Sequence, residues 1–392
     1  HGVDDKPLDS IVSLLLSLTE VTVGKHLVIA GGGHAHMLTL ANLHKFIEKG
    51  HKVTVIGPSP YHYYSGMGPG MLGKTYTPEE VRFATKHVVE KQGGVFIQDR
   101  VDRIDPESKS VYLESENTIP YDTLSCNVGS YVPMTIVSGA GRDIFTVKPI
   151  EKLIHFQERI LELTSQKKIT IGIIGGGPSA AETAGNIWRL GKYYCNNMPD
   201  ITILSGQKFM ARFTENVGNR IIHSLAKRGI QILEQDFVSE IKTGEITMES
   251  GQVHQKDLIL LAHGIKPYPV FQKSGLPTGP DGELLVNKYL QCTKYPEIFG
   301  GGDCIYFAYQ PLDKVGVYAV RENQILYHNL MASLDKTNLQ DFDPGGEYLL
   351  IFNMGNGTGV MQKKKLVLGG RLAFTIKNYI DRRFMKKFKS IE

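Results

Sequence analysis

Two glycine-rich turns are the segments of this chain best suited to chemistry. Gly31-Gly32-Gly33 and Gly175-Gly176-Gly177 each follow a short apolar run and precede a helical pattern. In such a turn one glycine makes the tight bend, and another lets the backbone approach a pyrophosphate. The following helix then offers free N–H groups and the positive end of its dipole. The sequence therefore predicts two sites for nucleotide phosphates.

Neither turn has the complete pattern of such a motif. The third glycine, which lets helix and strand pack closely, is replaced by His36 in the first turn and by the small Ala180 in the second. The acid that clamps a ribose after the second strand is missing from both units, which read Gly-Pro-Ser at 57–59 and Ser-Gly at 205–206. Ser59 is a substitute hydrogen-bond donor.

Three charged residues follow the second turn. Glu182 lies about two helical turns into the predicted helix, where it is either a solvated residue or a polar contact to a nicotinamide. Lys208 and Arg212 follow the second strand of this unit, where they meet either a 2′-phosphate or only solvent.

The elements that hold the turns form two β-α-β units. The hydrophobic pattern predicts strands at 26–30 and 52–56 around a helix at 35–49, and strands at 169–174 and 200–204 around a helix at 179–190. The first glycines of the two turns lie about 144 residues apart, which is an internal repeat at domain scale. We expect an α/β protein with two nucleotide-binding domains.

The composition is that of a globular protein, with 41% hydrophobic and 21% charged residues. The four cysteines form no C-x-x-C pair, so neither a zinc ribbon nor a paired redox dithiol is predicted, and no metal site is expected. A few scattered cysteines fit a reducing, cytoplasmic location. The apolar run at 11–18 is too short to span a bilayer and lacks the basic flank of a signal peptide.

Positive charge is concentrated at the C-terminal end. Residues 363–389 carry ten lysines and arginines against one aspartate, a net +9, whereas the whole chain is only +4. The rest of the chain is therefore acidic, which argues against a general nucleic-acid surface. Apolar residues recur every four positions through this tail: Leu372, Ile376, Ile380, Phe384 and Phe388. The pattern predicts a basic amphipathic helix at 371–389, which either contacts a membrane surface or docks on its own domain.

The chain resembles the two-dinucleotide-binding-domain flavoproteins, the pyridine nucleotide-disulfide oxidoreductase superfamily, over about residues 25–390. Five segments carry the resemblance: the two glycine turns, two crossover segments at 121–130 and 257–267, and the strand that ends in Gly302 and Asp303. Asn127 and His263 stand where the crossovers usually have threonine. Within the superfamily the chain resembles type II NADH dehydrogenases, sulfide:quinone reductases and the flavoprotein module sometimes fused to selenide-water dikinase, through residues 31–36, 64–70, 314–321 and 377–385.

The resemblance implies a fold of two Rossmann-like, three-layer β/β/α domains with a C-terminal α+β segment. It implies an N-terminal extension at 1–24, an FAD-binding domain at 25–150 and 285–345, an NAD(P)-binding-like domain at 151–284 and a C-terminal segment at 346–392. Asp303 is implied to bind the ribityl chain of FAD. The residues expected at FAD are Gly31, Gly32, Gly33, His34, Ala35, Ser59, Ser65, Val101, Asn127, Val128, Gly129, Gly302, Asp303 and Val315. The residues expected at NAD(P)H are Gly175, Gly177, Pro178, Ser179, Glu182 and Gly264.

Three residues are candidates for a catalytic role: Glu182, Lys314 and Tyr318. A helix that begins near Lys314 would point its N-terminus at the flavin, where positive potential stabilises the reduced anion. Lys314 either adds to that charge or is solvated. Tyr318, with Tyr61, Tyr63 and Tyr64, either lines a flat site for nicotinamide or quinone or packs in the core.

The function that the resemblance implies is electron transfer from NAD(P)H through FAD to a quinone or similar acceptor. A sulfide- or selenium-linked flavoenzyme is one alternative, and a flavin-binding sensor without fast turnover is another. The expected location is the cytoplasm, with membrane contact at the cytoplasmic face through the basic tail. A homodimer is compatible with this reading.

Overall fold

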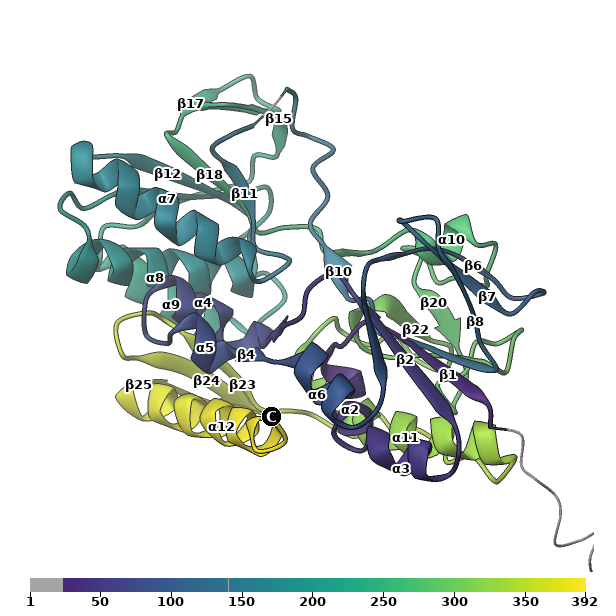
Figure 1. The fold of residues 1–392 in the computed structure, drawn as a ribbon. Coiled ribbons are helices and arrows are strands. Elements are labelled where there is room, and N and C mark those ends of the chain that lie inside the picture. Colours follow the sequence, from purple (N-terminus) through teal and green to yellow (C-terminus); the bar gives the residue numbers. More distant parts are fainter. Residues whose placement is uncertain (1–23, 140) are drawn as a thin grey trace, which may run out of the picture.

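The structure is a computed structural model that describes residues 24–139 and 141–392. The predicted extension, apart from residue 24, and its apolar run lie outside the described residues. Figure 1 shows two α/β bodies, with a small C-terminal sheet and helix beneath one of them. The predicted fold class, two Rossmann-like domains and a C-terminal α+β segment, is confirmed.

The first body is built on a parallel five-stranded sheet. Its strands, in spatial order, are β21 (Ile298–Gly300), β9 (Thr123–Cys126), β1 (His26–Ala30), β2 (Lys52–Gly57) and β5 (Val95–Gln98). Leu27, Val28 and Ile29 of β1 are wholly buried, because a parallel strand covered on both faces needs apolar side chains on both. β1 pairs in register with both β2 and β9, which places the end of β1 at the middle of the sheet edge.

Helices and a second, antiparallel sheet cover the two faces of this parallel sheet, so the first body has three layers. The helical elements are η1 (His34–His36), α2 (Met37–Ala41), α3 (Leu43–Glu48), α6 (Thr85–Lys91) and α11 (Gly316–Asp335). The antiparallel sheet consists of β6 (Val101–Asp105), β7 (Ser110–Leu113) and β8 (Thr118–Pro120). Smaller elements complete this body: β20 (Leu284–Val286), β22 (Ile305–Phe307), η3 (Gly302–Cys304) and α10 (Val270–Lys273).

The helix predicted at 35–49 is wrong as a single element. The segment forms a 3-10 turn and two short helices that break at Asn42, whose φ and ψ are −125° and 27°. The Asn42 side chain donates to the carbonyl of Leu38, and such local side-chain bonds compete with continuation of a helix.

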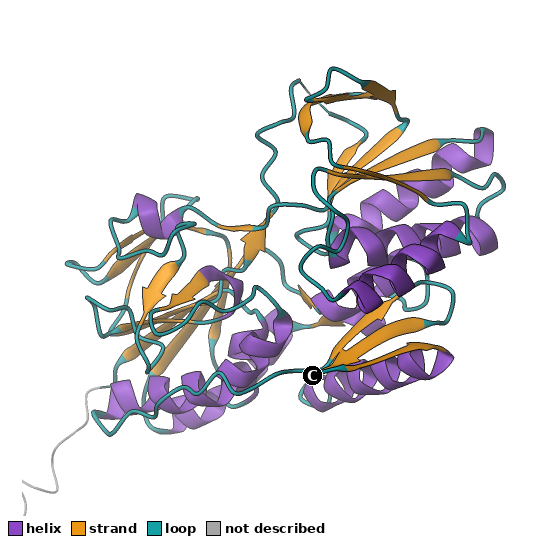
Figure 2. Ribbon diagram, turned by 180° about the vertical axis from the view of Figure 1, so that it is seen from behind, coloured by secondary structure: helices purple, strands orange, loops and turns teal. Residues whose placement is uncertain are grey.

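The second body repeats the architecture. Its parallel sheet has the order β11 (Ile144–Thr146), β18 (Leu258–Leu261), β12 (Thr170–Ile174), β13 (Asp200–Ser205) and β14 (Gln231–Glu234). It is covered by α7 (Lys152–Gln166), α8 (Pro178–Tyr194) and α9 (Glu215–Ala226), and by the antiparallel strands β15 (Val238–Lys242), β16 (Glu245–Met248) and β17 (Val253–Gln255). Figure 2 shows these strands above the main sheet and the helices below it. Helix α8 extends four residues beyond the predicted end at 190.

The domain boundaries differ from those expected at 151 and 284. Strand β11 lies in the second sheet although it precedes residue 151. Helix α10, which precedes residue 284, packs on β6 of the first body. The chain passes between the bodies through an antiparallel pair, β10 (Ser130–Tyr131) with β19 (Lys266–Pro267), so the crossover rather than residue 284 ends the second body.

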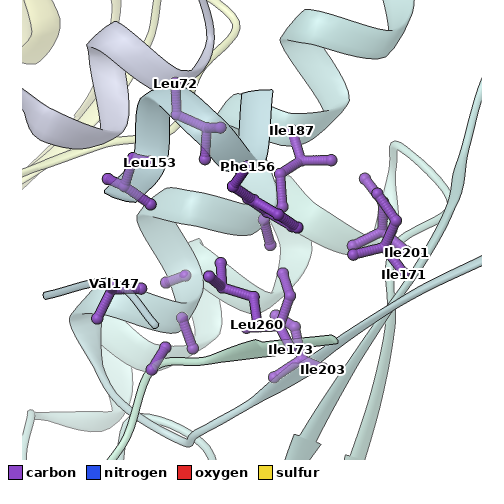
Figure 3. Close-up of a cluster of buried hydrophobic side chains, with 14 of the residues drawn as sticks. Leu72, Val147, Leu153, Phe156, Ile171, Ile173, Ile187, Ile201, Ile203 and Leu260 are labelled. Atoms are coloured by element: carbon purple, nitrogen blue, oxygen red, sulfur yellow. The ribbon is translucent and has the colours of Figure 1, made fainter. Parts of the chain in front are cut away.

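One segment of the first body packs into the second. It contains β3 (His62–Tyr63), η2 (Ser65–Met67), α4 (Gly68–Leu72), α5 (Pro78–Val81) and β4 (Arg82–Phe83). Figure 3 shows Leu72 at the end of α4 among Leu153 and Phe156 of α7, with Ile173 and Leu260 of the sheet nearby. All five side chains are at most 1% exposed, so the two bodies share one apolar core at this point.

The C-terminal segment is a three-stranded sheet, β23 (Leu350–Asn353), β24 (Gly359–Lys363) and β25 (Leu366–Gly370), followed by α12 (Arg371–Lys389). The predicted helix at 371–389 is confirmed. No helix among the described residues is long and apolar enough to cross a membrane.

Candidate functional site

One large cavity of about 2560 Å³ connects both glycine turns. Its wall includes Gly31 to His34, Gly175 to Ser179, the first crossover from Asn127 to Ser130, and Asp303. It also includes residues of the C-terminal helix, among them Lys377 and Phe384. The carboxyl ends of β1 and β12 therefore open into the same space, which is where parallel α/β sheets bind ligands.

The first turn is glycine because its backbone lies against the crossover. Gly31 has a φ of +90°, and a Cβ at this position would lie 2.2 Å from the carbonyl oxygen of Asn127. A Cβ on Gly33 would lie 2.6 Å from the Asn127 side chain. The Nδ2 atom of Asn127 is buried and has no hydrogen-bond partner among the described residues. A narrow backbone cradle with a free amide donor fits a dinucleotide such as FAD.

His36 replaces the third glycine without disturbing the turn. Its ring is fully buried, with Nδ1 2.6 Å from the carbonyl oxygen of Gly31 and Nε2 2.7 Å from Oγ of Ser125. Burial lowers the pKa of His36 to about 4, so the ring is neutral near pH 7. His36 therefore holds the turn against β9 and has no free nitrogen for a ligand.

Asp303 follows β21 and reaches the cavity in η3. It accepts a hydrogen bond from Ser130 Oγ at 2.7 Å and forms an ion pair with Lys148 at 2.5 Å. Burial acts to raise the pKa of Asp303, but the Lys148 ammonium and the hydrogen bond from Ser130 together outweigh it, and the pKa lies below its ordinary value. Asp303 is therefore an ionised acceptor, as a contact to ribityl hydroxyls requires.

Sequence reasoning missed two residues at this point. Lys148 reaches Asp303 from 155 positions earlier in the chain. Glu322 of α11 is 1% exposed and accepts from the backbone N–H of Gly302, and burial raises its pKa to about 7. The glutamate lies on the buried face of α11, and neither residue belongs to a local motif, so the sequence carries no signal for them.

The remaining residues expected at FAD fall into two groups. His34, Ser59, Ser65, Val101, Val128, Gly129, Gly302 and Val315 line the cavity, as do Gly31, Gly32, Gly33, Asn127 and Asp303. Ala35 is buried, and a Cβ added at Gly301 would lie 2.7 Å from the Cβ of Ala35. Ala35 therefore packs beneath the turn rather than on the cavity wall.

Two of the three catalytic candidates have different surroundings from those expected. Lys314 lines the cavity just before α11, but it pairs with Glu283 at 2.6 Å and with Asp281 at 3.8 Å, so its charge is compensated. The Tyr318 ring packs edge-on against Tyr348 at 5.6 Å, and Tyr318 is not among the described residues that line the cavity. The packing interpretation therefore fits Tyr318, whereas Tyr61, Tyr63 and Tyr64 do line the cavity.

The backbone of the second turn, like that of the first, lies against a crossover segment. A Cβ on Gly175 would lie 2.5 Å from the carbonyl oxygen of Ala262, at the second crossover. Gly177 is the N-cap of α8, and Pro178 begins the helix, where its missing N–H costs nothing. Ser179 and Gly264 also line the cavity. The residues expected at NAD(P)H thus lie together around the start of α8.

Glu182, the third catalytic candidate, lies where α8 meets the C-terminal segment. Its Oε1 accepts from the backbone N–H of Asn353 at 2.7 Å. Burial raises the pKa of Glu182 to about 7, although the nearby Lys377 opposes the rise. Glu182 is therefore able to exchange a proton near neutral pH.

Helix α12 contributes a buried ion pair to the same region. Lys377 donates to Asp381 and to the carbonyl of Gly66, both at 2.8 Å, and Tyr64 donates to Asp381 at 3.2 Å. Burial raises the pKa of Asp381 above its ordinary value, against the effect of Lys377. This set, Glu182, Lys377, Asp381 and Tyr64, is called the α12 cluster below.

Aromatic rings form the wall between the α12 cluster and the first turn. Phe384 stacks on Tyr64 with ring centroids 4.8 Å apart and on His34 at 5.9 Å. The Nε2 atom of His62 lies 3.3 Å from the Nδ1 atom of His34. Burial lowers the pKa of His34 to about 4 and that of His62 well below its ordinary value, so this wall is uncharged. A flat, neutral surface of this kind suits an aromatic ligand.

The cysteines near the first crossover are poorly suited to nucleophilic chemistry. Cys126 and Cys304 are buried, and the burial raises the pKa of both thiols, to about 12 for Cys304. Thiolates are the reactive form, so neither cysteine is activated.

The chain matches the family model "pyridine nucleotide-disulphide oxidoreductase" over residues 25–325. The type II NADH:quinone oxidoreductase of Staphylococcus aureus is 21% identical over 394 residues, with 94% of this chain and 96% of that protein covered. The nitrite reductase [NAD(P)H] of Bacillus subtilis is 24% identical over 289 residues, 71% of this chain, and this match spans about a third of that protein, 34%.

Solved structures show the same fold. NDH2 from Plasmodium falciparum in complex with NADH superimposes with a TM-score of 0.78 at 16% identity, covering 94% of this chain and 97% of the other. The sulfide:quinone oxidoreductase of Aquifex aeolicus gives a TM-score of 0.73 at 18% identity, covering 94% and 92%. At these identities the likeness establishes the architecture alone.

Proposed function

Because the chain belongs to the pyridine nucleotide-disulphide oxidoreductase family, we propose that it is an NAD(P)H dehydrogenase that passes electrons through FAD to a quinone or similar acceptor. The observation that carries the proposal is the single cavity shared by both glycine turns and helix α12. A nicotinamide at the second turn and a flavin at the first turn then meet in one space. The family assignment supports FAD as cofactor and NAD(P)H as electron donor.

The first turn, Asn127 and Asp303 would hold FAD, whose isoalloxazine supplies the hydride-accepting chemistry. Transfer from NAD(P)H to a quinone consumes one proton in addition to the hydride. Glu182, with its pKa near 7, is the residue of the α12 cluster best able to hold that proton. Tyr64 and Phe384 provide the flat surface against which a quinone ring would lie. Lys314 stays in the proposal only as a structural partner of Glu283.

The acceptor is tested by anaerobic titration of the holoprotein, followed by the flavin absorbance near 450 nm. We expect NADH or NADPH to bleach the flavin within one turnover time and a water-soluble quinone to restore it. Bleaching by sulfide alone would instead support the sulfide-linked alternative, which the inert Cys126 and Cys304 disfavour. Slow reduction by every donor would support a flavin-binding sensor. Dithionite defines complete bleaching in each case.

Membrane contact through α12 is a second part of the proposal. Residues at four-position spacing rotate about 40° per step around a helix, because one turn takes 3.6 residues. The predicted apolar stripe accordingly winds from solvent to core: Leu372 is 64% and Ile380 43% exposed, whereas Phe388 is buried. Tyr379, 63% exposed, shares the outer face with the exposed Arg383 and Lys387. Apolar side chains flanked by cations suit an anionic lipid surface.

We therefore expect Leu372→Asp with Ile380→Asp to reduce co-sedimentation with anionic phosphatidylglycerol vesicles by about tenfold. Exposed Leu and Ile side chains each gain roughly 1.5–3 kcal/mol when fully buried, and two added carboxylates are repelled by the lipid. Val253→Asp is the matched control, because Val253 is 48% exposed on β17 of the second body. Unchanged sedimentation of the double variant would show that the outer face of α12 does not contact the membrane.

A further inference from the structure

The end of β13 is where a dinucleotide-binding unit selects between NADH and NADPH, because an acid there binds the ribose 2′-hydroxyl and repels a 2′-phosphate. Here the strand ends at Ser205, which is 1% exposed and donates its hydroxyl to the carbonyl of Gln207 at 2.5 Å. The hydroxyl is therefore used within the turn. The Gly176 backbone lies against this hydroxyl, since a Cβ on Gly176 would lie 2.2 Å from the Oγ.

Position 206 is a glycine that lies against an aromatic ring. A Cβ on Gly206 would lie 2.1 Å from the ring of Phe237, which occupies the space that a carboxylate would need. Phe237 is itself 49% exposed, and its ring forms part of the cavity wall near the end of β13. Ser205 is thus held within the turn and Gly206 lies against the Phe237 ring, so neither position offers a carboxylate to a ribose.

Cations take the place of the acid. Lys208 and Arg212 follow β13 and line the cavity, and both are exposed. Arg212 has no ion-pair or hydrogen-bond partner among the described residues. Lys208 faces Glu215 at 3.6 Å, with both side chains more than half exposed, a pair that contributes little. Glu234, at the end of β14, accepts from the backbone N–H of Phe209.

We propose that this protein selects NADPH over NADH, with Arg212 as the main contact of the 2′-phosphate and Lys208 as a second. The inference rests on the proposed function, because it assumes that the nicotinamide nucleotide binds at the second glycine turn. Arg212 presents a planar guanidinium whose paired N–H donors match phosphate oxygens. A 2′-hydroxyl in the same position lacks the carboxylate that would accept its hydrogen bond, because residues 205 and 206 are serine and glycine.

The test separates nucleotide selection from turnover. Calorimetric titration of the FAD-loaded protein with adenosine 2′,5′-bisphosphate and with 5′-AMP measures the contribution of the 2′-phosphate directly. We expect the bisphosphate to bind at least about tenfold more tightly, since charge-assisted phosphate contacts are worth more than one factor of ten. Arg212→Ala should remove most of this ratio and leave 5′-AMP binding unchanged. Arg220→Ala is the matched control, because Arg220 is an exposed arginine of α9 that hydrogen-bonds Asn216 outside the cavity wall.

The same preference is expected in flavin reduction, where the kcat/KM ratio of NADPH to NADH should fall by about tenfold in Arg212→Ala. Equal affinity for the two adenosine ligands, or a ratio unaffected by Arg212→Ala, would overturn the inference while leaving the proposed function intact. If neither ligand binds and neither NADPH nor NADH bleaches the flavin, the proposed function and the inference both fail.

Discussion

Replacing Gly31 with alanine is expected to strip the protein of FAD. The φ of +90° costs an L-residue roughly 1–2 kcal/mol, and the new Cβ would lie 2.2 Å from the carbonyl oxygen of Asn127, so β1 and the crossover must separate. We expect the backbone strain and the separation together to cost about 3 kcal/mol of FAD-binding free energy, which corresponds to about 100-fold weaker binding. The measurement is the dissociation constant of FAD from the quenching of its fluorescence, with the flavin-to-protein ratio after gel filtration as a second reading.

Two further variants show which part of the effect comes from the close approach. Gly50→Ala has a similar φ of +86° but would meet nothing within 4 Å, so it should lower the melting temperature and keep FAD. Gly33 has an ordinary φ of −68°, and the three atoms nearest to a Cβ at Gly33 all belong to the Asn127 side chain. We expect it to fold and still bind FAD about tenfold more weakly, because it displaces that amide. FAD retained at full stoichiometry in Gly31→Ala would show that the cofactor does not bind in this turn.

Replacing Glu182 with glutamine is expected to lower turnover with a quinone by about 100-fold at pH 6, within the range typical of a lost general acid. The pKa of Glu182 is near 7, so the wild-type carboxyl is mostly protonated at pH 6 and ionised at pH 8. Turnover of the wild type should therefore fall as the pH rises through 7. The charged groups that face Glu182 are Lys377 and Asp381 of α12. The pKa of Asp381 is also raised, so its titration would broaden the pH dependence of turnover.

In Glu182→Gln the inflection near pH 7 should disappear, while the amide oxygen can still accept from Asn353 N–H, as Oε1 does now. Glu158→Gln is the control, because Glu158 is an exposed glutamate of α7 with only a surface contact to His155. The kcat is measured from pH 5.5 to 8.5 with saturating nicotinamide and quinone. An unchanged inflection in Glu182→Gln would assign the titration to another group.

Stability gives an independent reading of the same carboxyl. In the unfolded chain Glu182 ionises near its ordinary value of 4.5, whereas the folded protein holds the proton to about pH 7. The folded state binds more protons in this window, so the free energy of unfolding falls as the pH rises from about 4.5 to about 7. Glu182→Gln should flatten that part of the profile, measured by thermal unfolding at each pH.

Much of the fold was predictable because its signals are local. The strands β1, β2, β12 and β13 are apolar runs, of which β1 and β12 lead into the glycine turns, and the structure contains all four at the predicted places within one residue. The break in the helix after the first turn could not be predicted, because the pattern of apolar residues continues through Asn42. In the structure Asn42 has non-helical backbone angles, and its side chain donates to the carbonyl of Leu38.

The amino-acid sequence by itself determined the two nucleotide-binding units, the place of Asp303 after a buried strand and the basic C-terminal helix. Each of these depends on residues close together in the chain. Only the tertiary structure decided what surrounds them. It paired Asp303 with Lys148 across 155 positions, brought Glu182 near Lys377 and packed the Tyr318 ring against Tyr348. The physical reason is that burial and charge neighbours belong to the packed molecule, and these set both the space at a site and the pKa of its groups.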